Sequence, residues 1–96
     1  MSTRARVIVT GAVQGVSFRD SCRRAALDAR VSGWVRNRSD CAVEAVFEGD
    51  EIGVERMVSW AHHGPHSSGV EAVRVVEEEP VEGLTGFEVL PDEPTM

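Results

Sequence analysis

The sequence predicts an α+β domain in which two helices cover one face of a mostly antiparallel sheet. Apolar and polar residues alternate in strand-like runs near residues 5–10, 34–47 and 73–75, whereas apolar residues recur at helical spacing after residues 18 and 50. The predicted order is strand, helix, strand, strand, helix, strand, followed by a short fifth strand. A chain of 96 residues forms one domain with one hydrophobic core.

The first strand and the first helix each have one apolar face. The strand spans residues 5–10, where apolar positions alternate with others: Ala5, Val7 and Val9 against Arg4, Arg6 and Ile8. The helix begins near Phe18, and its apolar residues share one face: Phe18, Cys22, Ala25, Ala26 and Ala29. Because Cys22 lies on this stripe, we expect a buried thiol that behaves as a small hydrophobic group.

A hairpin and a second helix follow. Residues 34–38 are predicted to form the second strand, residues 38–41 a turn, and residues 43–47 the third strand, with Glu44 and Glu48 at the alternate positions. Asp50 is expected to cap the second helix. The apolar stripe of this helix is Val54, Met57, Val58 and Ala61, and Gly64-Pro65 ends it.

The remaining segments complete a split βαβ topology. Val73 and Val75 mark the fourth strand and residues 87–90 the short fifth one, after which two prolines predict a loose tail over residues 91–96. Parallel crossovers are right-handed, and a hairpin follows the first crossover, so the third strand should lie between the first and the second. This arrangement is the ferredoxin-like sandwich, here over a single domain of residues 1–96.

Charge is distributed unevenly along the chain. The net charge is −6, and all ten basic residues are arginine. Residues 1–40 carry eight arginines and three aspartates, whereas the rest carries two arginines and thirteen carboxylates. An acidic total argues against a broad nucleic-acid surface but allows a small anion in a local basic pocket. No run of apolar residues approaches the ~20 residues that are needed to span a membrane. Two cysteines and the absence of an apolar leader predict a cytoplasmic protein with reduced thiols.

The segment Gly11–Arg19 joins the first strand to the first helix and has the features of an anion site. Two glycines, Gly11 and Gly15, let the backbone bend and approach a ligand closely. The new helix presents unpaired N–H groups and the positive end of its dipole, and Arg19 adds a guanidinium in its first turn. The alternative is an ordinary strand-to-helix connection in which Ser17 caps the helix and Asp20 completes a variant capping box.

Asn37 is the second candidate. The second strand should run parallel to the first, which brings Asn37 to the same end of the sheet as the glycine turn. Asn37 shares a face with Val35, so its amide would be a polar group on the covered side and would need a partner. A bound water could supply it, or Asn37 could cap its own turn. His62 and His66 do not predict a metal site, because Gly64-Pro65 interrupts the helix that would align them.

Gly11–Arg19 and Gly33–Asn37, in this order and at this separation, closely resemble the two signature segments of the acylphosphatase family. The loop Gly64–Val70 is also similar, and the resemblance extends from about Arg4 to Leu90. It implies a ferredoxin-like fold and metal-independent hydrolysis of small acyl phosphates, without a cofactor. By resemblance, backbone N–H groups of Gln14, Gly15, Val16, Ser17 and Phe18 would cradle the phosphoryl oxygens, Arg19 would stabilise their charge, and Asn37 would orient the attacking water.

One departure and two competing functions accompany this resemblance. The family usually has glycine where Cys41 stands, and a positive φ there would cost about 1 kcal/mol. A non-catalytic anion-binding or interaction module on the same fold is the main alternative. An RNA-binding sheet is disfavoured by the charge and by the lack of an exposed aromatic pair. We expect a monomer that binds neither nucleic acid nor a membrane.

Overall fold

Seven elements make up the described part of the chain. The computed structural model describes residues 2–66, 68–77 and 80–94. In chain order the elements are β1 (Ser2–Ala12), α1 (Phe18–Asp28), β2 (Ser32–Asn37), β3 (Val43–Asp50), α2 (Glu51–His63), β4 (Gly69–Glu77) and β5 (Phe87–Val89). This is the predicted element order. No helix in these ranges has the length and hydrophobicity needed to cross a membrane.

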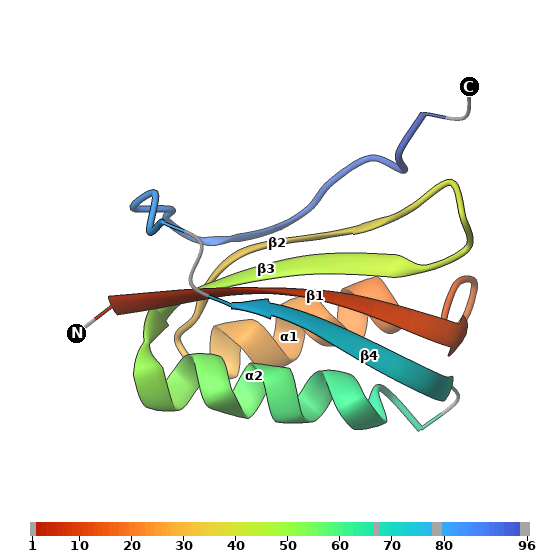
Figure 1. The fold of residues 1–96 in the computed structure, drawn as a ribbon, viewed down its shortest axis with the longest axis horizontal. Helices are drawn as coiled ribbons and strands as arrows, with labels where there is room; N and C mark the ends of the chain where they lie inside the picture. The colour runs from red at the N-terminus through yellow and green to blue at the C-terminus, as the bar shows by residue number, and fades with distance from the viewer. Residues whose placement is uncertain (1, 67, 78–79, 95–96) are drawn as a thin grey trace.

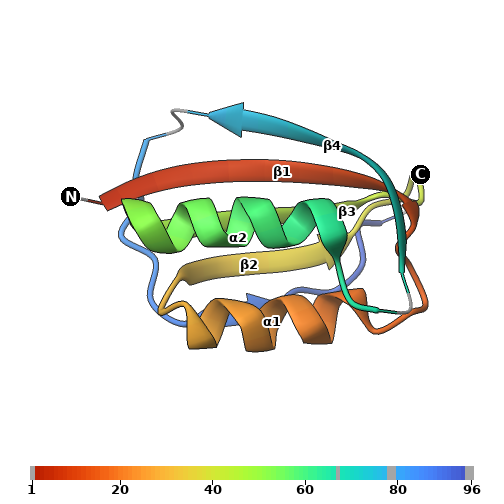
Figure 2. The same cartoon turned by 90° about the horizontal axis from the view of Figure 1, so that it is seen from below.

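The five strands form one sheet in the order β4-β1-β3-β2-β5. β3 pairs antiparallel with both β1 and β2, so β1 and β2 run parallel with β3 between them. β4 pairs antiparallel with β1, and β5 is the one parallel addition, next to β2. Both helices lie on the same face of the sheet (Figures 1 and 2). The predicted ferredoxin-like α+β fold is therefore confirmed.

The predicted helix caps differ from those observed. Ser17 and Asp50 occupy the N-cap positions of α1 and α2, but neither side chain makes a capping hydrogen bond. An N-cap residue is normally extended, whereas Ser17 is left-handed with φ 61°. The alternative in which Ser17 caps α1 and Asp20 completes a capping box is therefore wrong. Asp50 is extended, and nothing in its backbone conformation explains the missing cap.

The hydrophobic core lies between the helices and the sheet. Its buried residues include Val7, Val9, Val35, Val43 and Phe47 from the strands and Phe18, Cys22, Ala26, Val54, Met57 and Ala61 from the helices. Each such side chain larger than alanine stabilises the fold by roughly 1.5–3 kcal/mol. Burial raises the pKa of the Cys22 thiol, which therefore stays protonated and inert, as predicted.

The other face of the sheet carries a buried ion pair that the alternation did not predict. Arg4 Nη1 lies 2.7 Å from Glu48 Oε2, and their side chains are 5% and 3% exposed. Glu48 also accepts hydrogen bonds from the backbone N–H groups of Glu82, Gly83 and Leu84. Burial opposes ionisation of Glu48, but the N–H groups of Glu82 and Leu84 together with Arg4 outweigh it and lower the pKa of Glu48. The segment before β5 is thereby held across this face.

Residues after β5 continue along β2. The N–H of Leu90 donates to the carbonyl of Val35, and the N–H of Glu93 donates to the carbonyl of Asn37. The Glu93 carboxylate accepts hydrogen bonds from the N–H and the hydroxyl of Ser39. These contacts differ from the expected loose tail, because backbone hydrogen bonds to β2 continue after β5 ends at Val89, one of them past Pro91. Residues 95 and 96 lie outside the described ranges.

Candidate functional site

A glycine-dependent bend follows β1. Gly11 has φ 120°, and a Cβ there would overlap the carbonyl oxygen of Gly69. Gly15 has φ 76°, and a Cβ there would meet no protein atom within 4 Å. Gly11 therefore allows the close approach of β4, whereas Gly15 faces open space. Ser17 is left-handed as well, so the backbone turns sharply just before α1.

The N-terminus of α1 lies at this bend. The N–H of Ser21 is the first to close a helical turn, by donating to the carbonyl of Ser17 at 3.0 Å. The N–H groups of the preceding turn and the helix dipole favour an anion at this point. A cavity of about 360 Å³ lies here, lined by Val13, Gly15, Ser17, Phe18, Arg19, Asp20 and Val89. It could hold a phosphoryl group.

Asn37 lies at the same end of the sheet. Asn37 pairs with Val43 on β3, and Val43 pairs with Val9 on β1, so the three residues form one rung. Residues on one rung share a face of the sheet, and Val9 and Val43 are buried in the core, so the Asn37 side chain also lies on the face that the helices cover. Asn37 is 7% exposed, and its Oδ1 atom has no hydrogen-bond partner among the described residues. This buried acceptor on the covered side matches the position predicted from the alternation.

Two sets of contacts join the bend to the end of β2. Gln14 Nε2 donates to the carbonyls of Arg38 and Ala42, at 3.0 and 2.9 Å. On the other side, Arg19 Nη1 lies 3.0 Å from Asp92 Oδ1, and the next residue, Glu93, donates to the carbonyl of Asn37. Figures 1 and 2 both show the β1–α1 connection, the β2–β3 turn and the segment that follows β5 at one end of the molecule.

Similarity to known proteins agrees with this geometry. The acylphosphatase family profile matches residues 5–89. The acylphosphatase of Rubrobacter xylanophilus is 55% identical over 86 residues, which cover 90% of this chain and 78% of that protein. The acylphosphatase of Gloeobacter violaceus is 53% identical over 89 residues, or 93% of this chain and 95% of that protein. The chain belongs to the acylphosphatase family.

A solved structure supports the same assignment. The crystal structure of acylphosphatase from Bacillus subtilis superposes with a TM-score of 0.87 at 36% identity, covering 94% of this chain and 99% of that one. The expectation of an acylphosphatase-type enzyme with this fold is therefore confirmed.

The predicted site residues are brought together by the fold. Residues Gln14 to Arg19 span the bend and the start of α1, and Asn37 ends β2 at the same end of the sheet. Gln14 is hydrogen-bonded to the residue that follows Asn37, but Asn37 is not among the residues that line the cavity at the bend. The departure from the acylphosphatase pattern at Cys41 falls in a left-handed conformation, with φ 71°.

Sequence reasoning missed Asp92 and Glu93. Two flanking prolines predicted a tail without contacts there, and no local pattern indicated their partners.

Two of the three histidines, His62 and His63, have partners within α2. His62 and His63 each donate from Nδ1 to the carbonyl four residues earlier, at 2.9 and 3.1 Å. Within residues 2–66, 68–77 and 80–94, no three metal-ligating side chains come together.

Trp60 packs against Phe18 with ring centroids 5.1 Å apart, so the tryptophan supports the helix that carries Arg19. Ser67, within the predicted loop 64–70, lies outside the described residues.

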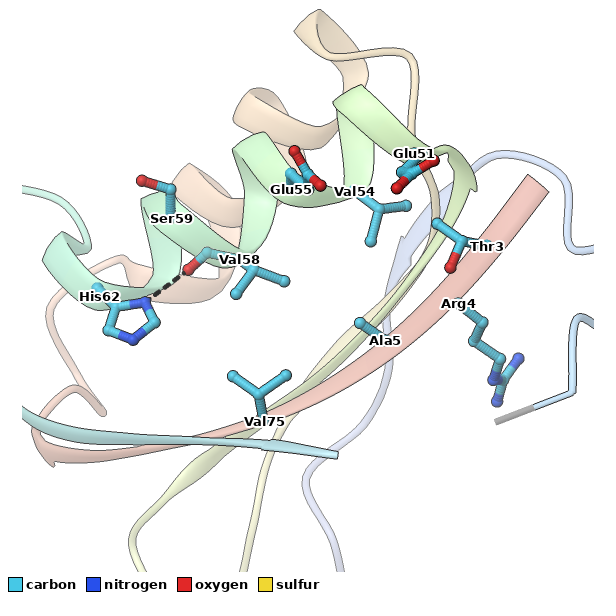
Figure 3. A pocket seen from close by; sticks show the side chains of 10 residues that line it. All are labelled: Thr3, Arg4, Ala5, Glu51, Val54, Glu55, Val58, Ser59, His62 and Val75. Carbon is cyan, nitrogen blue, oxygen red and sulfur yellow. Dashed lines mark hydrogen bonds between the residues drawn. The ribbon is translucent and has the colours of Figure 1, made fainter. Parts of the chain in front are cut away.

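A larger cavity of about 700 Å³ lies between α2 and the strands β1 and β4. Figure 3 shows Glu51 and Glu55 along its α2 side and His62 at one end. The Arg4 side chain extends away from α2, where it pairs with Glu48. Glu51 and Glu55 repel a phosphoryl group, and Arg4, the arginine of this lining, is already paired with Glu48, so this cavity does not suit an acyl phosphate.

Proposed function

We propose that the protein hydrolyses small acyl phosphates to a carboxylate and inorganic phosphate, without a metal or cofactor. The observation that carries this proposal is the buried Oδ1 of Asn37, which has no partner among the described residues and lies at the same end of the sheet as the bend that precedes α1. A buried acceptor without a partner is costly, and one bound water would satisfy it. Such a water would lie next to a phosphoryl group held at the bend.

The backbone and Arg19 would hold the phosphoryl group. N–H groups of residues 14–18 donate to its oxygens, and the guanidinium of Arg19 binds the same group as a charged fork. Charge accumulates on these oxygens in the transition state of phosphoryl transfer. Donors that are already oriented stabilise this charge without reorganisation, which is the main source of rate enhancement in such a site.

Asn37 would position the nucleophile. Its Oδ1 accepts a hydrogen bond from water and directs the water oxygen towards phosphorus. The new P–O bond forms as the bond between phosphorus and the acyl oxygen breaks, and the carboxylate leaves with that electron pair. The water proton passes to a phosphate oxygen, so no protein base is required. Catalysis then depends on positioning and electrostatics.

Release of phosphate from benzoyl phosphate in the presence of a chelator tests this proposal. We expect turnover by the unaltered chain, and losses of about 100-fold or more in Arg19→Ala and Asn37→Ala. Arg23→Ala is the matched control, because Arg23 is an exposed arginine one turn further along α1. Circular dichroism establishes that each variant is folded. Absence of turnover, with phosphate still bound, would favour the non-catalytic anion-binding module.

We also propose a cytoplasmic monomer as the working form. The support for the compartment is chemical: both cysteines are free thiols, with Cys22 buried and Cys41 exposed. An exposed free thiol is compatible with a reducing compartment. Light scattering coupled to size exclusion tests the monomer, and a molar mass of twice the chain would contradict it.

A further inference from the structure

The side chain of Gln14 joins two parts of the site. Its Nε2 atom donates both of its hydrogens, one to the carbonyl of Arg38 and one to that of Ala42. These two residues close the turn between β2 and β3, because the N–H of Arg38 donates to the carbonyl of Ala42 at 2.8 Å. Gln14 itself lies in the bend before α1. One amide therefore fixes the turn against the bend.

Asn37 is held by its pairing with Val43, by the Glu93 N–H that donates to its carbonyl, and by the turn that follows it. It directly precedes Arg38 at the end of β2. Its Oδ1 has no hydrogen-bond partner among the described residues, so no hydrogen bond of that oxygen fixes the amide there. The turn that follows contains Cys41 at φ 71°, a conformation that L side chains adopt at a cost. An external tie therefore contributes to holding the end of β2.

We propose that Gln14 is a positioning residue, whose side-chain amide sets the distance between Asn37 and the phosphoryl group held at the bend. This inference rests on the proposed function. Glutamine suits the role because a primary amide carries two donors. Glutamate would present lone pairs to the two carbonyls, and methionine would fill the same space without either hydrogen bond.

The test uses Gln14→Met and Gln14→Glu, alone and combined with Asn37→Ala. A displacement of about 1 Å at a reacting group costs up to about 100-fold in rate, so we expect kcat to fall about 10- to 100-fold in both single variants. The inhibition constant for inorganic phosphate should change less than about twofold, because the backbone N–H groups stay in place. Thr10→Val is the matched control: it removes a hydrogen bond from β1 to the carbonyl of Ala72, on the side away from Asn37.

The double variant separates positioning from a general structural role. If Gln14 acts through Asn37, Gln14→Met should lower kcat by less than about twofold in the Asn37→Ala background. A full additional loss there would overturn the inference. A parallel loss of phosphate inhibition in the single variant would overturn it as well, because Gln14 would then serve the anion itself.

Failure of the proposed function gives a different result. The unaltered chain would then release no phosphate from benzoyl phosphate. NMR with inorganic phosphate still decides the inference: Gln14→Met should shift the side-chain NH₂ resonances of Asn37 and preserve the phosphate-induced shifts of the backbone amides from Gly15 to Phe18. Unshifted Asn37 resonances would overturn it.

Discussion

The guanidinium of Arg19 is paired with the carboxylate of Asp92, at 3.0 Å. The two side chains are 35% and 64% exposed, so water and salt screen the pair. A phosphoryl group bound at the bend as proposed would compete with this carboxylate for the same cation. Asp92 would then weaken anion binding.

Asp92→Asn should strengthen phosphate binding. Exposed ion pairs contribute about 0.2–1 kcal/mol, so we expect the inhibition constant for phosphate to fall by up to about fivefold at low salt, and by less at high salt. Glu88→Gln, which alters an exposed carboxylate on β5, changes the net charge equally and should have little effect. Unchanged or weaker inhibition in Asp92→Asn would mean that Asp92 does not compete.

Gly15→Ala should separate backbone strain from ligand exclusion. Gly15 and Gly83 have nearly the same φ, 76° and 77°, and a Cβ at either meets no protein atom within 4 Å. Alanine at either position should cost about 1–2 kcal/mol of unfolding free energy. In Gly15→Ala alone, the methyl group enters the space proposed for the anion, so phosphate inhibition should weaken at least about tenfold. Denaturant melts and inhibition assays measure the two effects.

If phosphate inhibited the Gly15 and Gly83 variants equally well, the anion would bind elsewhere than at the bend.

Cys41→Gly should be neutral or stabilising, by up to about 1 kcal/mol, because glycine adopts φ 71° without strain. Arg30, with φ 58° after α1, provides a matched comparison outside the site. Arg30→Gly should gain a similar amount and leave kcat unchanged. Denaturant unfolding measures both variants. A loss of more than about 1 kcal/mol in Cys41→Gly would show that the Cys41 side chain supports the turn.

The contact between Glu93 and the turn should be lost in acid. The backbone N–H of Ser39 lowers the pKa of Glu93, and the Ser39 hydroxyl and the arginines Arg36 and Arg38 lower it further. A carboxyl group whose folded pKa lies below its unfolded value stabilises the fold above about pH 4.3 and loses this contribution as pH falls through the lowered pKa. The N–H resonance of Ser39 should therefore shift as the pH falls below about 4.3, when the Glu93 carboxylate becomes protonated.

Glu93→Gln should abolish this acid transition of the Ser39 resonance. A transition that persists in Glu93→Gln would assign it to another carboxylate, such as Asp40, whose pKa is also lowered, mainly by the N–H of Ala42 and by Arg38.

The sequence predicted the features that depend on local period. Ala5, Val7 and Val9 alternate towards the core, and Phe18 and Cys22 lie on a buried helical stripe. The bend and Asn37 were predicted together because parallel strands end at the same edge of a sheet. Burial of Arg4 with Glu48 could not be predicted, since alternation alone assigns charged positions to the open face. That face is covered only when a segment 34 residues further along donates to Glu48.

Asp92 and Glu93 illustrate the same limit. Their partners are Arg19, 73 residues away, and Ser39, 54 residues away. No short pattern encodes such pairings. The left-handed conformation of Ser17 was not predicted either, because serine is a common N-cap residue and the identity of the residue does not reveal a positive φ.

The division of labour between the bend and Asn37 is tested most directly by one comparison: kcat for benzoyl phosphate and the inhibition constant for inorganic phosphate, both in Asn37→Ala. If Asn37 serves the water alone, kcat should fall about 100-fold or more, and the inhibition constant should change less than about twofold. If kcat persists, or if phosphate inhibition is lost together with turnover, Asn37 does not position the nucleophile and the proposed mechanism is wrong.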